Sequence, residues 1–131
     1  MALSSIATAT TTQPIAQIYS SSTQIYTYPV TEWVEYIQEK ATTTEVANLT
    51  LEIIKRESGG WPDAKNASSS ASGLLQFIDS TFQTECIDRY KLATSTNQKN
   101  DPIIQIDCGL KMLEQPEGWK HWSESGQYDT L

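Results

Sequence analysis

The 131 residues have room for one compact core, because domains of about 100 to 150 residues are the commonest size. Hydrophobic residues make up 38% of the chain, yet no run approaches the ~18 consecutive apolar residues of a membrane-spanning helix, so the composition predicts a soluble protein. The formal net charge of −7, without clustered Lys and Arg, gives no reason to expect nucleic acid as a partner.

The N-terminal part of the chain is uncharged as far as residue 31 and is rich in Ser and Thr. Such a tract cannot build a core, so we interpret residues 1–28 as a tail or linker. Ala7-Thr8-Ala9 has the small-residue form of a signal-peptide cleavage site, but the basic segment and apolar run of a complete signal peptide are missing. A trimmed secretory precursor and a flexible spacer both remain open. Residues 25–30 have strand-like composition and could dock on the domain.

Two helices are predicted next. The first begins near Thr31, which can cap it, and its apolar residues recur at helical spacing: Val30, Trp33, Val34 and Ile37. The second should begin at a capping box formed by Thr42 and Glu45 and end at Gly59-Gly60. One face of this second helix carries Val46, Leu49 and Ile53.

Two further helices follow a loop over residues 59–73 that is rich in Gly, Ser, Asn and Asp, and that we expect to carry function. The third helix should open at Asp79 or Ser80 and present Phe82, Cys86 and Tyr90. The fourth opens with Asp101-Pro102, a cap followed by the residue favoured at the first helical position. It should be central and buried, because two apolar stripes run along it: Ile103, Ile106, Leu110 and Leu113, then Ile104, Cys108 and Met112. Pro116 and Gly118 should stop it.

Glu57 continues the apolar face of the second helix and lies in its last turn. The helix dipole disfavours a negative charge there by roughly 0.3–1 kcal/mol. Both features disfavour the charged form, so we expect a raised pKa for this carboxyl group. A protonated carboxyl is what a glycosidase needs to protonate a leaving sugar oxygen. The alternative is a Glu that reaches solvent or pairs with Lys or Arg.

Three short sequence motifs, which follow one another along the chain, support a catalytic role for Glu57. They are Glu57-Ser58-Gly59-Gly60, then Gly73-Leu74-Leu75-Gln76-Phe77 followed by Ser80-Thr81-Phe82, and an altered third motif from Gln105 to Met112. Together they resemble the transglycosylase SLT family of the lysozyme-like superfamily, with similarity to its resuscitation-promoting-factor and goose-type lysozyme branches. The resemblance spans about residues 43–122. The sequence departs from the family motifs at Leu75, where the family has Met, at Gln105, where it has Asn, and at Met112, where it has Tyr.

The resemblance implies a mainly α fold, a lysozyme-like helical domain of about four to six helices over residues 29–131 with an extended N-terminal tail. It also implies a lytic transglycosylase that acts on the glycan strands of peptidoglycan. Glu57 would protonate the oxygen between N-acetylmuramic acid and N-acetylglucosamine, then accept the proton of the muramic acid C6 hydroxyl, giving a 1,6-anhydro product. No cofactor is expected.

Further site residues follow from the same resemblance. Gln76 would contact the sugar or orient the acid, and Ser58 would cap the helix end and steady Glu57. The remaining candidates for substrate binding are Ser69, Gly73, Leu75, Tyr90 and Trp119. Tyr90 and Trp119, and with them Trp122, could stack on sugars or belong to the core. Met112 leaves open how Glu57 is oriented.

Cys86 and Cys108 are the only cysteines, and they fit one disulfide or two buried thiols. We favour the disulfide, and with it a secreted or cell-envelope location, with any upstream signal peptide removed. No metal is expected, because the pair lacks companions at ligand spacing. A monomer is expected. Two other functions stay open: a hydrolase in which Asp63, Asp79 or Asp88 activates water, and a catalytically silent module that binds peptidoglycan.

Overall fold

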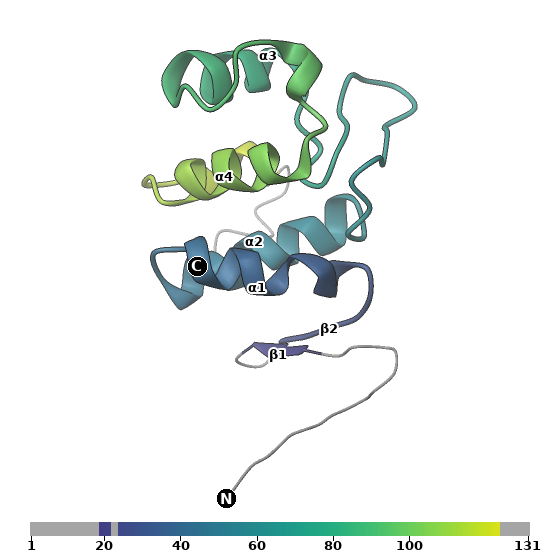
Figure 1. The fold of residues 1–131 in the computed structure, drawn as a ribbon, viewed down its shortest axis with the longest axis vertical. Coiled ribbons are helices and arrows are strands. Elements are labelled where there is room, and N and C mark those ends of the chain that lie inside the picture. The colour runs from purple at the N-terminus through teal and green to yellow at the C-terminus, as the bar shows by residue number, and fades with distance from the viewer. Residues whose placement is uncertain (1–18, 22–23, 124–131) are drawn as a thin grey trace, which may run out of the picture.

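A computed structural model describes residues 19–21 and 24–123 and confirms a mainly helical domain. The elements are stacked along the long axis of the molecule (Figure 1), from a hairpin through α1 and α2 to α4, with α3 at the far end. The hairpin pairs β1 (Tyr19–Ser21) with β2 (Gln24–Tyr26) antiparallel. No helix in these described ranges is long and apolar enough to cross a membrane.

The predicted first helix consists of a 3₁₀ turn, η1 (Val30–Trp33), that continues into α1 (Val34–Lys40). Val30, Val34 and Ile37 are buried as their spacing predicts. The cap is wrong: Thr31 lies inside η1 with only 7% of its surface exposed, and its amide donates to the carbonyl oxygen of Thr27. The predicted docking of residues 25–30 is confirmed, because Tyr26 and Val30 both belong to the core.

Helix α2 (Thr44–Glu57) lies between α4 and α1 in Figure 1 and contacts both. The predicted capping box is wrong by one residue. Thr43, not Thr42, has the extended backbone of a cap, and its hydroxyl oxygen accepts from the Val46 amide at 3.1 Å. Apolar burial extends beyond the predicted stripe to Ala47, Leu51 and Ile54, because α2 contacts η1, α1 and α4 on different sides.

The third predicted helix begins at Asp79 as expected, with a short α3 (Asp79–Thr81) that continues as a π-helix, η2 (Phe82–Arg89). A 3₁₀ turn, η3 (Thr96–Gln98), leads to α4 (Pro102–Leu113). The Asp101 side chain caps α4 by accepting from the amides of Ile103 and Ile104. The Cys86–Cys108 disulfide is confirmed and joins η2 to α4.

The prediction that α4 is central and buried is confirmed except in its first turn, where Ile104 is only partly buried and Ile103 is exposed. Ile103 is 38% exposed, because it lies in the first turn at the surface end of the helix. Two residues outside the apolar stripes, Gln105 and Gly109, are buried instead. A Cβ at Gly109 would lie 2.4 Å from Leu75 Cδ1, so this small residue allows α4 to pack closely against the loop that precedes α3. The chain ends its described part with η4 (Gly118–His121).

Candidate active site

An open cavity of about 270 Å³ lies at the C-terminal end of α2. Three separate parts of the chain build it: the end of α2, the loop and first turn of α3, and η4. The described residues that line it are Glu57, Asn66, Ser69, Ala71, Gln76, Phe77, Ile78, Thr81, His121 and Trp122. Among these, Glu57 is the only carboxylate and His121 the only side chain that can carry a positive charge. Three of the predicted site residues therefore meet at one cavity: Glu57, Ser69 and Gln76.

Glu57 is the last residue of α2 and is partly buried. The residue after it fixes the helix end. The Ser58 hydroxyl donates to the Ile54 carbonyl oxygen at 3.1 Å and accepts from the Gly60 amide at 3.1 Å. The predicted capping by Ser58 is thus observed, and it holds the backbone on the C-terminal side of Glu57. Trp33 adds a second tie, since its indole N–H donates to the Gly60 carbonyl oxygen at 2.9 Å.

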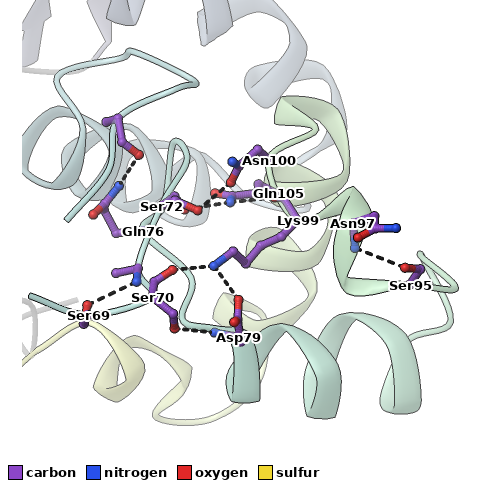
Figure 2. A network of polar contacts seen from close by, with 12 residues as sticks. Ser69, Ser70, Ser72, Gln76, Asp79, Ser95, Asn97, Lys99, Asn100 and Gln105 are labelled. Carbon is purple, nitrogen blue, oxygen red and sulfur yellow. Dashed lines mark hydrogen bonds and ion pairs between the residues drawn. The ribbon is translucent and has the colours of Figure 1, made fainter. Parts of the chain in front are cut away.

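Gln76 faces the cavity from a left-handed backbone conformation, φ +53°, which is uncommon for a residue with a side chain. Its amide nitrogen donates to the carbonyl oxygens of Ala64 at 3.1 Å and Gly73 at 2.9 Å. The first of these bonds crosses the loop from residue 76 to residue 64. Figure 2 shows Gln76 beside the other polar side chains of the loop. Gln76 therefore both lines the cavity and ties the two sides of the loop together.

Gln105 supports the loop from beneath. It is fully buried on α4, and its side-chain oxygen accepts from the Leu75 amide at 2.8 Å. Its nitrogen donates to the carbonyl oxygens of Ser72 at 2.9 Å and Lys99 at 2.7 Å (Figure 2). All three bonds go to backbone groups. The Gln105 side chain therefore satisfies buried amide and carbonyl groups that have no partner within a regular strand or helix. The sequence marks Gln105 as a departure from a motif, and its position between the apolar residues Ile104 and Ile106 is the signal that could have indicated a buried amide.

Lys99 and Asp79 attach the outer part of the loop to the start of α3 (Figure 2). The Lys99 ammonium forms an ion pair with the Asp79 carboxylate at 2.7 Å and donates to the Ser70 carbonyl oxygen. The Asp79 amide in turn donates to the Ser70 hydroxyl at 2.9 Å. Only 9% of the Lys99 side chain is exposed, so this pair is shielded from solvent on one side.

The three aspartates considered as a second carboxylate lie outside the cavity. Asp79 is paired with Lys99. Asp88 accepts from the Gln83 side chain at 3.0 Å on the surface of η2. Asp63 lines a different groove. None of them is among the described residues that share the cavity with Glu57.

The other predicted binding residues are divided between the loop and the core. Ser69 lines the cavity, and its hydroxyl oxygen accepts from the Ala71 amide at 3.1 Å. Gly73 and Leu75 are buried beneath it, and Leu75 has no exposed surface, so its side chain packs in the core while its carbonyl oxygen accepts from the Trp122 indole at 2.8 Å.

Tyr90 and Trp119 are not brought to the Glu57 cavity. Tyr90 lines a neighbouring cavity together with Met112, which is 2% exposed, and Trp119 packs against the core with the Lys120 ammonium 5.7 Å from its ring centre. The motif residue Thr81 does line the cavity, and so do three residues that the motifs do not mark: Asn66, Ile78 and His121.

The geometry is that of a polar, open cavity with one acid group at a helix end and amide and hydroxyl groups around it. A ligand with many hydroxyl groups fits such a lining, because the lining offers both hydrogen-bond donors and acceptors.

Comparison with known protein families gives one match, to a model described as the Transglycosylase SLT domain, over residues 35–119. That range runs from α1 to η4 and includes Glu57, the loop and all of α4. The description names neither the resuscitation-promoting-factor branch nor the goose-type branch, so that finer likeness stays a prediction. No curated protein and no solved structure matches the chain.

Proposed function

Because the chain belongs to the transglycosylase SLT domain family, whose members act on peptidoglycan, we propose that it is a lytic transglycosylase that cleaves the β-1,4 bond between N-acetylmuramic acid and N-acetylglucosamine. The observation that carries the proposal is the position of Glu57. It is the only carboxylate among the described residues that line the cavity, and Gln76 and Ser69 lie on the same cavity. One acid with polar neighbours is the arrangement that a single-carboxylate mechanism requires.

In this mechanism the protonated Glu57 carboxyl donates its proton to the glycosidic oxygen as the bond from that oxygen to muramic acid C1 breaks. An oxocarbenium-like species forms, and the glucosamine unit leaves with a hydroxyl group. The Glu57 carboxylate then accepts the proton of the muramic acid C6 hydroxyl, whose oxygen bonds to C1. The product is a 1,6-anhydro sugar, no water is consumed, and Glu57 regains its proton.

The loop would hold the sugar in place. Since the amide nitrogen of Gln76 donates to two backbone carbonyl groups, we assign its carbonyl oxygen the contact with a sugar hydroxyl. Gln105 and Lys99 act behind it as positioning residues, because both bond to the loop backbone and neither is among the described residues that line the cavity.

Substitution of the acid tests the proposal. Glu57→Gln keeps the shape of the side chain but removes the proton that the leaving oxygen needs, so the rate of glycan cleavage should fall by about 10²–10⁴-fold with an unchanged unfolding temperature. Release of soluble muropeptides from purified sacculi measures it. Asp88→Asn is the matched control, an exposed carboxylate outside the cavity, and it should cleave like wild type.

The products separate the proposal from its two rivals. The glycan is digested in water enriched in a heavy oxygen isotope, and the products are analysed by mass spectrometry. The anhydro ends should be lighter than reducing ends by one water and should carry no heavy oxygen. Reducing muramic acid ends with heavy oxygen would show a hydrolase instead. Binding to sacculi without any cleavage, equal in wild type and Glu57→Gln, would show a silent binding module.

We also propose that the protein works outside the cytoplasm, where disulfides persist. The support is the Cys86–Cys108 bond. Thiol-reactive reagent applied to the undenatured protein from its native source should label neither cysteine, and labelling of both would contradict the proposal.

A further inference from the structure

A second groove is lined by the turn that follows Glu57 and shares no lining residue with the Glu57 cavity. Its volume is about 580 Å³, and its walls are mainly aromatic rings and prolines. The described lining residues that bear on its ligand are Tyr28, Glu32, Trp33, Gly60, Trp61 and Asp63. Tyr28 is 57% exposed and Trp61 51% exposed, which makes them two of the most exposed large hydrophobic residues in the described chain.

The aromatic rings of this groove are held in place. The Tyr28 and Trp61 rings meet edge to face, with centroids 5.9 Å apart and planes at 90°. The Trp33 indole is fixed by its bond to the Gly60 carbonyl oxygen. A preformed site loses little side-chain entropy when a ligand binds, so these exposed rings are suited to recognition.

The charge of the groove selects the ligand. Glu32 and Asp63 are exposed carboxylates on its walls, and none of its described lining residues is a Lys, Arg or His. Carboxylates beside aromatic faces attract a cation, because the ring face and the carboxylate both carry negative electrostatic potential. An ammonium group on a partly apolar chain therefore fits this groove better than an anion or a neutral sugar.

We propose that this groove binds the peptide stem of peptidoglycan, the short peptide attached to muramic acid. The group recognised is the free ammonium group at the end of the side chain of the stem's diamino residue. The inference rests on the proposed function, since the substrate supplies the ligand. Trp61 follows Glu57 by four residues, so at most about 14 Å of backbone separates the groove from the acid. A stem of a few residues, attached to a muramic acid bound in the Glu57 cavity, spans that distance. The groove would select stretches of glycan whose stems carry a free amine.

Binding of the peptide alone tests the inference. A synthetic stem tetrapeptide with a free side-chain amine is titrated into the full chain by calorimetry and compared with the same peptide acetylated on that amine. The free peptide should bind at least ten-fold more tightly than the acetylated one, and added salt should weaken its binding. Trp61→Ala and Asp63→Asn should each lose the difference, whereas Asp88→Asn should keep it.

Three results would overturn the inference: no binding of the free peptide, equal binding of the two peptides, or wild-type binding by both Trp61→Ala and Asp63→Asn variants that keep the wild-type unfolding temperature. Binding of peptide-free glycan that depends on Trp61 would also overturn it, in favour of a sugar platform. Glu57→Gln should bind the peptide like wild type, since it leaves the groove intact. The peptide titration and the cleavage assay thus fail separately, one for the groove and the other for the proposed function.

Discussion

Gly73 occupies a position where two separate constraints exclude a side chain. Its φ is +88°, and a Cβ placed on it would lie 2.1 Å from the side-chain nitrogen of Gln105. Gly59 has a similar φ of +66°, but its nearest neighbour would be the Trp61 ring at 3.8 Å, an ordinary contact. The two glycines therefore form a matched pair that separates backbone strain from a clash.

We predict that Gly59→Ala lowers the free energy of unfolding by about 1 to 2 kcal/mol, the cost of a left-handed backbone for a residue with a Cβ. Gly73→Ala should lose that amount and about 1 to 3 kcal/mol more, because Gln105 must move and its bonds to the loop weaken. Urea unfolding of the two variants measures the difference. Equal losses would mean that Gln105 is not packed against Gly73.

At the level of single residues, the sequence identifies the candidate catalytic acid better than it identifies the residues that hold the loop beside it. Glu57 is recognisable because an acidic residue continues an apolar stripe, and the cavity contains it. For Gln105 the sequence offers only an amide among apolar residues, and this does not identify its partners, which are amide and carbonyl groups of a loop that is distant in the sequence. Leu75 belongs to a motif, yet only its backbone takes part, through bonds to Gln105 and Trp122.

The start of α2 gives a prediction at the scale of an element. Thr43→Ala should lower the free energy of unfolding by about 1 kcal/mol, because the Val46 amide loses the hydroxyl oxygen that it donates to. Thr42→Ala is the control and should change it by a few tenths of a kcal/mol at most, since Thr42 is exposed and lies before the cap. Thermal unfolding of the two variants measures the effect. A larger loss in Thr42→Ala than in Thr43→Ala would show that Thr42 is the cap, as the sequence predicts.

The disulfide joins two elements that contact each other, η2 and α4, across a sequence separation of 22 residues. Its loss should lower the free energy of unfolding by about 3 kcal/mol, because the unfolded chain gains the freedom of the opened loop. Unfolding of the protein with and without reductant measures this. Cys86→Ala/Cys108→Ala serves as the control and should be as unstable in both conditions, while a wild-type curve that ignores complete reduction would contradict the prediction.

The elements themselves follow from the sequence where a cap and an apolar stripe agree. Helix α4 has both, and its start at Asp101-Pro102 and its burial are as predicted. The start of α2 is misplaced by one residue because Thr42 and Thr43 are chemically equal, and only the extended backbone of Thr43 decides between them. The π-helical form of η2 does not follow from the sequence, because the four-residue spacing of Phe82, Cys86 and Tyr90 is that of an ordinary α-helix.

The cavity forms only when the whole chain is folded, because its walls come from distant segments. Its walls come from segments as far apart as Glu57 and His121, and no local pattern links these two residues. What joins the segments is also long-range: the Trp122 indole bonds to the loop, and the Gln105 amide bonds to it from the opposite side. For this reason the sequence predicts the acid and the loop but misses His121, Ile78 and Asn66. It also assigns Tyr90 and Trp119 to the site, although neither is among the described residues that line this cavity.

The contact between α1 and α4 makes stability depend on alkaline pH. The Tyr36 hydroxyl donates to the Asp107 carboxylate at 2.6 Å. Burial, and then this bond and the Asp107 charge, raise the pKa of Tyr36 from its ordinary value near 10 to about 12. The folded chain therefore keeps a proton that the unfolded chain releases, so the stabilisation is complete below pH 10 and is lost as the pH rises from 10 to 12.

Tyr36→Phe should make that loss shallower, because a phenyl ring has no proton to release, and it should also lower the free energy of unfolding at pH 7 by about 0.5 to 1.5 kcal/mol through the missing hydrogen bond. Burial raises the pKa of Tyr26 and Tyr90 as well, so the slope should decrease without vanishing. Urea unfolding at pH 7, 10 and 11 measures both effects. Asp107→Asn is the matched control: since burial is the largest cause at Tyr36, removing the charge alone should preserve most of the slope. If wild type and Tyr36→Phe lose stability in parallel above pH 10, the proton of Tyr36 does not couple α1 to α4.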